Sequence, residues 1–376
     1  MIRVFVNLLP FYLQSSTDIN YARSLGKSSS KIGAFFYYPH KWSWGLKENL
    51  KLVINKFLSI IGCRKRINVV HPKEFLNSEF NEKEFDIVYS QGTCPQNSGN
   101  VPLFIESGLW RPGQNKAYTE FDEHYFTQVT IPLFQDYLKH NSIVNLKSNI
   151  EIENAKQLFP CYKNSFVKIP FLLPDLIPIS QSELLAKHKE DDTIRIGFVG
   201  GQANRKGLPA LIQAYQKVKL ELKGIKKMEL HIISGYNDGN VYVPKGYDIK
   251  EHGKLPYGNV LQVMKTWHIF AMVSNNESYG LVYIEAMANG CINIVRDFYP
   301  QREFVDFGKI GFLAFPDNIE SISKALKDAI MLTRDARISM AVSGLEKFNT
   351  EYEYTHVVKQ FREALNKCAS LKYVNR

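Results

Sequence analysis

Two carboxylates with a glycine between them mark the part of the chain where the chemistry is clearest. Glu277 and Glu285 lie eight positions apart, and Gly280 stands between them, directly before an apolar stretch. The glycines at both ends of that stretch predict a helix over 281–288, with Gly290 as its C-terminal stop. The start of such a helix presents free backbone N–H groups and favours an anion such as a diphosphate. Glu277 would lie beside the group that the phosphate carries, and Glu285, about two helical turns further along, could reach a ribose.

A second group of residues suits the same chemistry. Gly200 and Gly201 follow a predicted strand, and Arg205 and Lys206 come a few positions later. Two cations and a flexible backbone near one point can stabilise the negative charge that grows on a leaving diphosphate. The alternative is that Arg205 and Lys206 only form a solvated turn before the next helix.

The elements that must position these residues alternate between strands and helices. In the second half, strands are predicted at 194–199, 229–233, 269–273 and 292–295, and helices at 208–222, 259–266, 281–288, 321–332 and 354–371. In the first half, the predicted strands are 2–7, 32–37, 67–70, 85–89 and 103–105. This alternation predicts an α/β protein with parallel, doubly wound sheets. Ligands of such sheets bind beyond the carboxyl ends of the strands, where all of the residues above are expected.

Segments of the second half resemble a known family of enzymes. The sequence over 274–290 contains a Glu-x7-Glu pattern that is similar to the signature of retaining, nucleotide-sugar-dependent glycosyltransferases of family 4, which have the GT-B fold. Residues 194–201 and 204–207 resemble the family's first strand and basic phosphate loop, and 253–256 resembles the turn that cups the nucleobase. The resemblance covers about residues 194–345.

The resemblance implies a GT-B-like architecture, in which two Rossmann-like domains face a cleft and a C-terminal helix crosses back to the first domain. The predicted N-terminal, acceptor-side domain is 1–178, completed by a terminal helix at 352–376. The predicted C-terminal domain, 179–351, would bind the nucleotide-sugar donor. We interpret 171–178 and the polar stretch 180–192 as the interdomain linker.

The resemblance also implies a role for each candidate residue. Glu277 would hold hydroxyls of the donor sugar, Glu285 the ribose, and Lys206 with Arg205 the leaving diphosphate. The implied catalytic residues are Glu277, Arg205 and Lys206, and the implied donor-binding residues are Gly200, Gly201, Lys254, Leu255, Tyr279, Gly280, Leu281, Val282 and Glu285. Transfer would occur on one face of the sugar, with the leaving phosphate assisting deprotonation of the acceptor. No general base from the protein is then required.

The first domain departs from the family pattern. Residues 7–10 stand in place of the usual Gly-Gly loop, and 102–108 contains no histidine where the family often has one. Glu106 or Ser107 in that segment could contact the donor sugar or the acceptor. A structural role in the loop is an equal alternative.

Composition limits the remaining function classes. The chain has 376 residues, a formal net charge of +10, and five cysteines without a C-x-x-C pair. The charge favours anionic partners, and the scattered cysteines argue against a zinc site or a disulfide framework. No run of 18 apolar residues is present, and we interpret the apolar N-terminus as a core strand rather than a signal peptide. We expect no metal, no cofactor and no nucleic acid; the expected substrate is a nucleotide-sugar such as a UDP- or GDP-sugar.

Some other polar residues are weaker candidates. The acidic segment 120–124 could bind a metal, but no further ligand spacing supports one, which favours a solvated loop. His231 and His268 each lie next to an apolar strand and are interpreted as structural histidines.

The segment between Trp44 and Ile61 is predicted to form a basic, amphipathic helix. From Lys41 to Arg66 the chain has seven basic residues and one acidic residue. This pattern favours docking on an anionic membrane surface. The alternative is an ordinary helix that packs on the first sheet and exposes its lysines.

Together these features predict a cytoplasmic, retaining glycosyltransferase, with a peripheral position at the inner membrane face if the basic helix docks. It would transfer a sugar from a nucleotide-diphosphate-sugar to a glycan or glycolipid, in the synthesis of cell-surface polysaccharide or lipopolysaccharide. The alternative is a catalytically silent nucleotide-sugar-binding subunit that partners an active glycosyltransferase.

Overall fold

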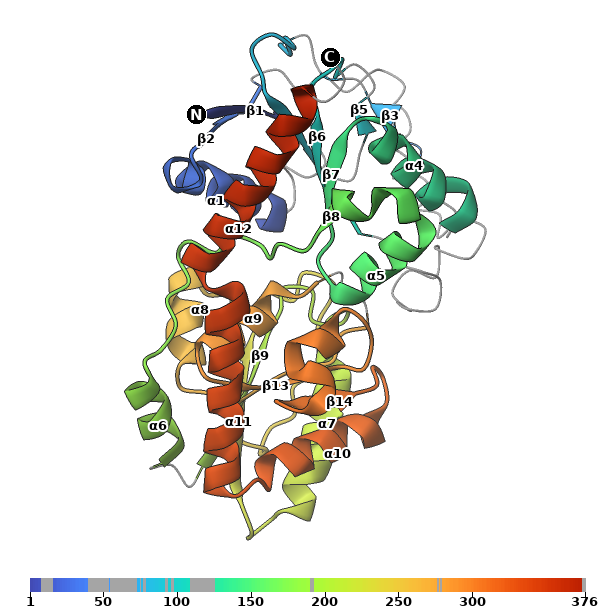
Figure 1. Cartoon of the computed structure of the whole chain (residues 1–376). Coiled ribbons are helices and arrows are strands. Elements are labelled where there is room, and N and C mark those ends of the chain that lie inside the picture. Colours follow the sequence, from blue (N-terminus) through green and yellow to red (C-terminus); the bar gives the residue numbers. More distant parts are fainter. Residues whose placement is uncertain are drawn as a thin grey trace. The chain divides into compact units, whose positions relative to one another are not determined.

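The structure is a computed structural model of the chain (Figure 1). It describes residues 1–7, 16–39, 54, 73–74, 76, 79–91, 94–95, 98–108, 126–189, 193–275, 277 and 279–373, with the backbone alone at 16–23, 73–74 and 373. The chain forms two compact units. The first comprises Met1–Trp110, Glu123–Pro174 and Tyr354–Arg376, and the second contains Asp175–Glu353.

The first unit is built on a six-stranded sheet with the order β2-β1-β4-β6-β7-β8, in which every pairing is parallel. Its strands are β1 (Ile2–Asn7), β2 (Ala34–Tyr37), β4 (Ile87–Gln91), β6 (Leu103–Glu106), β7 (Ser142–Asn145) and β8 (Phe166–Val167). The short strands β3 (Lys73–Glu74) and β5 (Cys94–Pro95) pair separately. Its helices are α1 (Ser16–Ile32), η2 (Phe126–Thr130), α4 (Ile131–Lys139), α5 (Asn149–Leu158), η3 (Pro160–Ser165), α12 (Tyr354–Ser370) and η6 (Leu371–Tyr373).

Side chains alternate across this sheet and fill a core on each face. Val4 faces the core that contains Leu25 of α1 and Phe361 of α12, whereas Phe5 faces the core that contains Phe134 of α4. Successive side chains of a strand point to opposite faces, so an apolar run of this length is buried on both sides. The C-terminal helix α12 therefore completes the core of the unit that contains the N-terminus, as Figure 1 shows.

The second unit has its own six-stranded parallel sheet, with the order β11-β10-β9-β12-β13-β14. Its strands are β9 (Thr193–Val199), β10 (Lys227–Ile233), β11 (Ile249–Gly253), β12 (Ile269–Met272), β13 (Ile292–Arg296) and β14 (Phe312–Ala314). Its helices are α6 (Gln181–Lys189), α7 (Leu208–Glu221), α8 (Tyr257–Met264), α9 (Leu281–Ala288), η4 (Gln301–Gly308), α10 (Ile319–Ile330), α11 (Arg334–Lys347) and η5 (Phe348–Tyr352).

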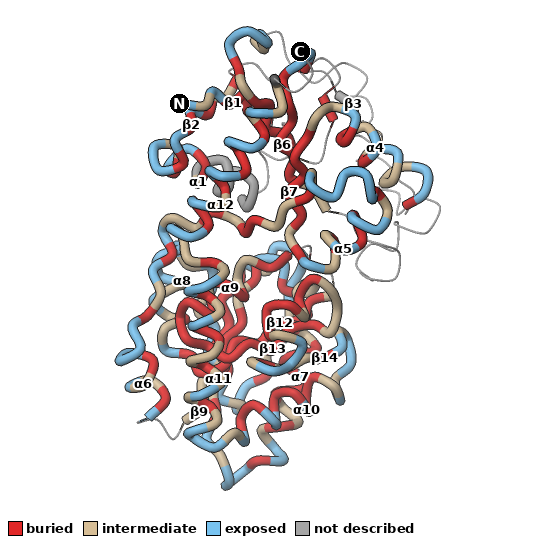
Figure 2. The backbone as a smooth tube through the Cα atoms, viewed as in Figure 1, coloured by how far each residue is buried: buried red, intermediate tan, exposed pale blue. Residues whose placement is uncertain are grey.

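The order of the strands makes this sheet doubly wound. From β9 the chain moves to β10 on one side, and from β12 it moves to β13 on the other side. Because such crossovers are right-handed, helices that follow opposite directions along a sheet cover opposite faces. In the unit, α7 packs against α10, and α11 packs against α6 and α9. The central strands are the most deeply buried part of the trace in Figure 2.

The two units confirm the predicted fold class, with two parallel-sheet Rossmann-like domains and a terminal helix that returns to the first. The structure places the unit boundaries at 174/175 and 353/354, where the sequence suggested 178/179 and 351/352. β1 and α9 have the predicted limits. The strand predicted at 67–70 lies outside the described residues.

One prediction about the linker is wrong. The polar stretch 180–192 is not wholly a linker, because Gln181–Lys189 forms α6. Ser180 begins this helix with a capping box: its backbone N–H donates to the Glu183 carboxylate at 2.6 Å, and its Oγ accepts from the Glu183 N–H at 3.2 Å. Leu184 and His188 of α6 are fully buried. Likewise, Ile32 ends α1 rather than beginning a strand, because Gly33 adopts a left-handed φ of 77° and stops the helix.

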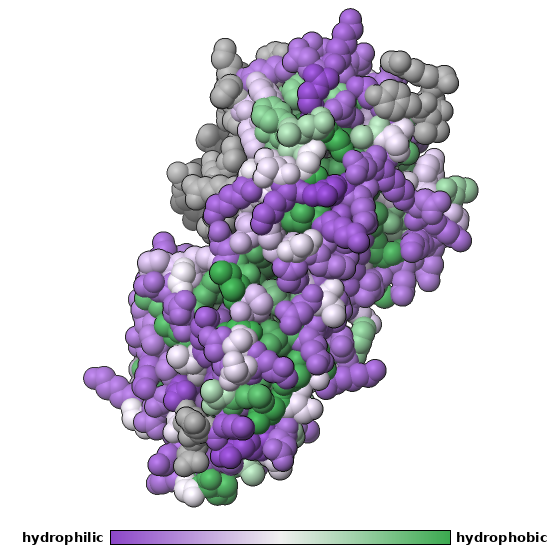
Figure 3. Space-filling view, turned by 60° about the vertical axis from the view of Figure 1, so that its left-hand side comes forward, coloured by the Kyte–Doolittle hydropathy of each residue, from purple (hydrophilic) through white to green (hydrophobic). Residues whose placement is uncertain are grey.

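Within the described residues, no helix is long and apolar enough to cross a membrane. On the face shown in Figure 3, hydrophilic side chains cover most of the surface, with hydrophobic side chains interspersed among them.

Candidate functional site

The strand order of the second unit defines where a ligand can bind. The order reverses between β9 and β12, and the loops that leave their carboxyl ends diverge there. In open α/β sheets this switch point is the crevice in which ligands bind. The loop after β9 carries 200–207 and the loop after β12 carries 273–280, so both predicted groups of residues lie at the switch point.

The fold joins these two loops directly. The backbone N–H of Asn275 donates to the carbonyl of Arg205 at 3.0 Å. The Lys206 ammonium donates to Oε2 of Glu277, in an ion pair whose side chains are only 16% and 7% exposed. Desolvation lowers the pKa of Lys206, and the Glu277 carboxylate opposes that shift. The two residues that the sequence assigned to phosphate and sugar are thus in contact with each other.

Helix α9 begins at this point with its backbone N–H groups pointing out of the helix. Gly280 precedes it with φ 100° and ψ 66°, and no side chain caps the helix start. A Cβ atom at Gly280 would lie 2.5 Å from the ring of Tyr283, so only glycine fits. Tyr279 is buried, and its carbonyl accepts a hydrogen bond at 2.9 Å from Gln301. Leu281 and the following valine, Val282, form the first turn and are half-buried.

A third loop, which the sequence interpretation missed, holds the basic segment in place. The Asp238 carboxylate accepts the backbone N–H groups of Asn204 at 3.2 Å and of Arg205 at 2.8 Å. The backbone N–H of Asn237 donates to the carbonyl of Gly201 at 2.7 Å. Two backbone donors of this loop are therefore already used within the second unit. The sequence signal that could have revealed this loop is the pair of turn-forming residues Asn237 and Asp238, which follow β10.

Gly200 and Gly201 differ in what their missing side chains allow. A Cβ at Gly200 would lie 3.0 Å from the Lys206 side chain, so this glycine lets the lysine fold back over the loop. Gly201 is exposed, and a Cβ there would meet the Asn237 amide at 3.0 Å. Arg205 is half-buried and donates to the Gln202 side chain at 2.5 Å.

Glu285 lies further along α9 and is held by an aromatic hydroxyl. Its residue is half-buried, and Tyr257, the first residue of α8, hydrogen-bonds its carboxyl group. Burial raises the pKa of Glu285 to about 7, and the bond from Tyr257 opposes that rise. The turn ahead of Tyr257 contains Lys254, which is exposed, and Leu255, which is half-buried.

In the first unit, the structure gives Glu106 partners that the sequence did not indicate. Glu106 is 4% exposed and forms an ion pair at 2.6 Å with Lys147. It also accepts a hydrogen bond at 2.9 Å from the side chain of Asn145. Desolvation lowers the pKa of Lys147, which Glu106 opposes. Ser107 is half-buried, and its backbone N–H donates to the Asn145 carbonyl at 3.2 Å.

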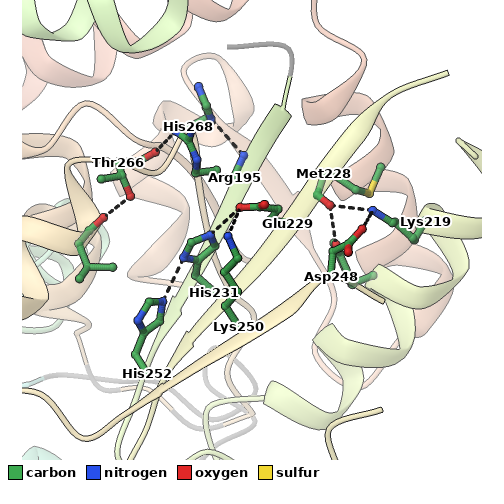
Figure 4. Close-up of polar contacts among 12 residues, drawn as sticks. Arg195, Lys219, Met228, Glu229, His231, Asp248, Lys250, His252, Thr266 and His268 are labelled. Carbon is green, nitrogen blue, oxygen red and sulfur yellow. Dashed lines mark hydrogen bonds and ion pairs between the residues drawn. The ribbon is translucent and has the colours of Figure 1, made fainter. Parts of the chain in front are cut away.

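Both histidines interpreted as structural are hydrogen-bonded within the second unit, as Figure 4 shows. His231 lies between Glu229, at 3.2 Å, and His252, at 3.0 Å. His268 is fully buried and accepts the backbone N–H of Arg195 at 3.1 Å. Burial lowers the pKa of His268 to about 3, so this ring stays neutral.

Two further sequence-predicted features fall outside the described residues: the acidic segment 120–124, and the basic segment between Trp44 and Ile61 apart from Ile54. Across the described part of the chain, no group of three or more histidine, cysteine, aspartate or glutamate side chains could hold a metal ion.

The fold is that of the GT-B class of proteins, as comparison with solved structures shows. Sucrose-phosphate synthase from Thermosynechococcus elongatus matches with a TM-score of 0.62 and 14% identity, over 98% of this chain and 99% of that chain. Anabaena Alr3699/HepE, in complex with UDP and glucose, matches with a TM-score of 0.57 and 13% identity, over 97% and 99%. WaaG, a glycosyltransferase involved in lipopolysaccharide biosynthesis, matches with a TM-score of 0.53 and 11% identity, over 96% and 99%.

The sequence of the second unit matches one family of glycosyltransferases. Residues 180–340 match the family described as glycosyl transferases group 1. The matched region contains the switch point, α9 and the Lys206–Glu277 pair. No protein with a curated description matches the chain significantly.

Proposed function

We propose that this chain is a retaining glycosyltransferase that transfers a sugar from a nucleotide-diphosphate-sugar to a glycan or glycolipid acceptor. The observation that carries the proposal is the meeting of Lys206, Arg205 and the uncapped start of α9 at the switch point of a sheet. Such a concentration of positive charge suits a diphosphate leaving group. The match of 180–340 to group 1 glycosyltransferases supports the same reaction.

Each residue of the site then has a task. Lys206, Arg205 and the first backbone N–H groups of α9 bind the diphosphate and stabilise the charge that it gains as the sugar leaves. Glu277 accepts hydrogen bonds from hydroxyl groups of the donor sugar, and Glu285 accepts hydrogen bonds from those of the ribose. The acceptor hydroxyl gives its proton to the departing phosphate on the same face of the sugar. The assignment to glycosyltransferase family 4 and its Glu-x7-Glu motif remains part of this proposal.

The identity of the substrates is proposed from the structural neighbours. Anabaena Alr3699/HepE was crystallised with UDP and glucose, and another similar structure from E. coli holds UDP-2-fluoro glucose. A UDP-sugar is therefore the first donor to test, with a GDP-sugar second. WaaG acts in lipopolysaccharide biosynthesis, and we propose a cell-surface polysaccharide or lipopolysaccharide as the product here. A catalytically silent subunit is less well supported, because the family that residues 180–340 match is described as glycosyl transferases.

We also propose that the reaction needs no metal ion, because cationic side chains and a helix start supply the positive charge. Unchanged turnover in excess chelator is the expected result. Loss of activity with chelator, restored by magnesium or manganese, would contradict it.

The basic segment between Trp44 and Ile61 carries a separate proposal, that a cytoplasmic enzyme docks peripherally on the anionic inner membrane face. It rests on the sequence pattern alone. The protein should sediment with anionic vesicles at low salt and not with neutral ones; no sedimentation with either would remove this proposal.

The nucleotide site is tested by Lys206→Ala. This change should weaken binding of the cognate nucleoside diphosphate by about 1.5–3 kcal/mol, the range for a hydrogen bond to a charged group. Titration calorimetry with UDP and GDP measures the change. Lys217→Ala is the matched control, because Lys217 lies on α7 and pairs with Glu320, away from the site. Equal affinities of wild type and Lys206→Ala would mean that this loop does not bind the diphosphate.

A further inference from the structure

The Lys206–Glu277 ion pair has a consequence for the ligands of the site. The backbones of both partners are held in place: the Lys206 backbone N–H donates to the Gln202 carbonyl at 2.9 Å, and Gln301, the first residue of η4, donates to the Glu277 carbonyl at 3.3 Å. With side chains 16% and 7% exposed, the pair is shielded from water. A shielded pair interacts more strongly than an exposed one. The contact is therefore part of the architecture of the site.

The pair makes Glu277 a tethered competitor for the ammonium of Lys206. An anion that binds at the switch point must share Lys206 with the carboxylate or displace it. Desolvation disfavours an ammonium without a counter-anion, so Lys206 needs one of the two. A diphosphate consequently meets an ammonium whose charge is largely neutralised.

Donor and product place different demands on this pair. A nucleotide-sugar brings hydroxyl groups that can donate to Glu277, so that the carboxylate keeps a partner when Lys206 turns to the phosphate. A free nucleoside diphosphate brings no sugar. It also carries about one more negative charge at neutral pH, because a terminal phosphate has a second pKa of about 6. Binding this charge draws Lys206 away from Glu277 and leaves the shielded carboxylate without a partner, which disfavours binding.

We propose that the Lys206–Glu277 pair discriminates against the nucleoside diphosphate product in favour of the nucleotide-sugar donor. Glu277 thereby promotes product release as well as binding the sugar. This inference rests on the proposed function, because it assumes that the switch point binds a nucleotide-sugar.

The test measures a ratio of affinities in wild type and in Glu277→Gln. Titration calorimetry on wild type gives the Kd of UDP, GDP, ADP and dTDP and of their glucose esters. The nucleotide that binds most tightly is then used, with its glucose ester, for all variants. Glu277→Gln removes the charge and keeps the shape, so the diphosphate should bind at least about tenfold more tightly relative to its sugar ester than in wild type. An unchanged ratio, or a shift toward the sugar ester, would overturn the inference.

Two variants show whether the effect comes from the pair. At pH 8, where Glu285 is ionised, Glu285→Gln removes the charge of another carboxyl group in the second unit, and it should leave the ratio unchanged. In a Lys206→Met background, Glu277→Gln should give less than about a third of its gain, because no ammonium is left to release. An equal gain with and without Lys206, or an equal shift in Glu285→Gln, would refute a role for the pair.

Folding and function are separated by further measurements. If Glu277→Gln does not fold, Glu277→Asp withdraws the carboxylate from Lys206 at constant charge and should still shift the ratio toward the diphosphate. Failure of all four diphosphates to bind wild type would overturn the proposed function, and the inference with it. Binding to wild type without a shift in either variant would overturn the inference alone.

Discussion

At the scale of the residue, Glu285 is a carboxyl group that the fold stabilises in its neutral form. Burial raises its pKa to about 7 from 4.5. Between these values the folded protein binds more protons than the unfolded chain, so stability falls as pH rises from about 4.5 to 7 and stays lower above that. Glu285→Gln should therefore raise the free energy of unfolding at pH 8, by on the order of 1–3 kcal/mol.

Denaturant unfolding at pH 4.5 and pH 8 measures this effect. The gain should be present at pH 8 and small at pH 4.5, where Glu285 is protonated in the folded state and half protonated in the unfolded chain. Glu346→Gln, at an exposed position of α11, is the control and should change little at either pH. A Glu285→Gln variant that is less stable than wild type at pH 8 would contradict the cost of ionising this carboxyl group in the folded protein.

Contacts between individual side chains were the part of the site that the sequence predicted least well. Glu277, Lys206 and Glu285 were recognised individually from their types and spacing. The contact between Lys206 and Glu277 joins residues 71 positions apart, which spacing along the chain does not reveal. Asp238 and Lys147 were missed because each acts through a partner on a distant loop or strand. An isolated aspartate in a turn, or a lysine after a short strand, is typical of many solvated positions.

At the scale of the element, the start of α7 depends on a glycine. Gly207 adopts φ 81° and a Cβ there would lie 2.3 Å from the carbonyl oxygen of Val273, at the end of β12. Gly207→Ala should destabilise the second unit by about 2–4 kcal/mol, because the left-handed backbone and the clash with rigid backbone add together. It should also weaken diphosphate binding, since it separates the loops after β9 and β12.

Gly344→Ala gives the matched control for that change. Gly344 lies inside α11, is buried, and has nothing within 4 Å of the position of a Cβ. Alanine there should stabilise the protein by up to about 1 kcal/mol, as expected for a helix interior. Unfolding curves of both variants provide the comparison. A Gly207→Ala variant as stable as Gly344→Ala would show that α7 can begin without the close approach to Val273.

Elements were predicted well where local signals agree. α9 has a glycine before it and another after it, and β1 has the apolar residues Val4, Phe5 and Val6 at its centre, so the limits of both elements were predicted to the residue. β14 is apolar but has only three residues, too few to stand out in the sequence. β11 is an edge strand with the polar sequence Ile-Lys-Glu-His-Gly and lacks the apolar pattern of a central strand. α6 was hidden in a polar stretch, although Ser180 and Glu183 have the spacing of a capping box.

At the scale of the whole molecule, the alternation of strands and helices was sufficient to predict two parallel sheets. The alternation was not sufficient to assign the terminal helix to one of the two domains; that assignment came from the resemblance to the glycosyltransferase family. The physical reason is visible in α12: Val357, Phe361 and Leu365 lie on one face at helical spacing and are fully buried. Such a stripe shows that a helix packs on a sheet, but does not show which of two sheets it covers.

The placement of α12 makes a prediction about the stability of each unit. Phe361 is fully buried and its ring lies 5.2 Å from that of Phe104 in β6. Phe361→Ala should cost about 3–5 kcal/mol of stability, the range for a large aromatic side chain removed from a core. Because Phe361 fills the core of the first unit, the amides of β1 and β4 should lose hydrogen-exchange protection while those of β9 and β10 keep theirs.

Phe270→Ala is the reciprocal variant, since Phe270 is equally buried in β12 and packs against Tyr283 in the second unit. It should expose β9 and β10 to exchange and leave β1 and β4 protected. Hydrogen exchange with mass spectrometry on the two full-length variants distinguishes the patterns. If Phe361→Ala lowered protection in β9 and β10 as much as in β1 and β4, the two cores would unfold together, and the C-terminal helix would not belong to the first unit alone.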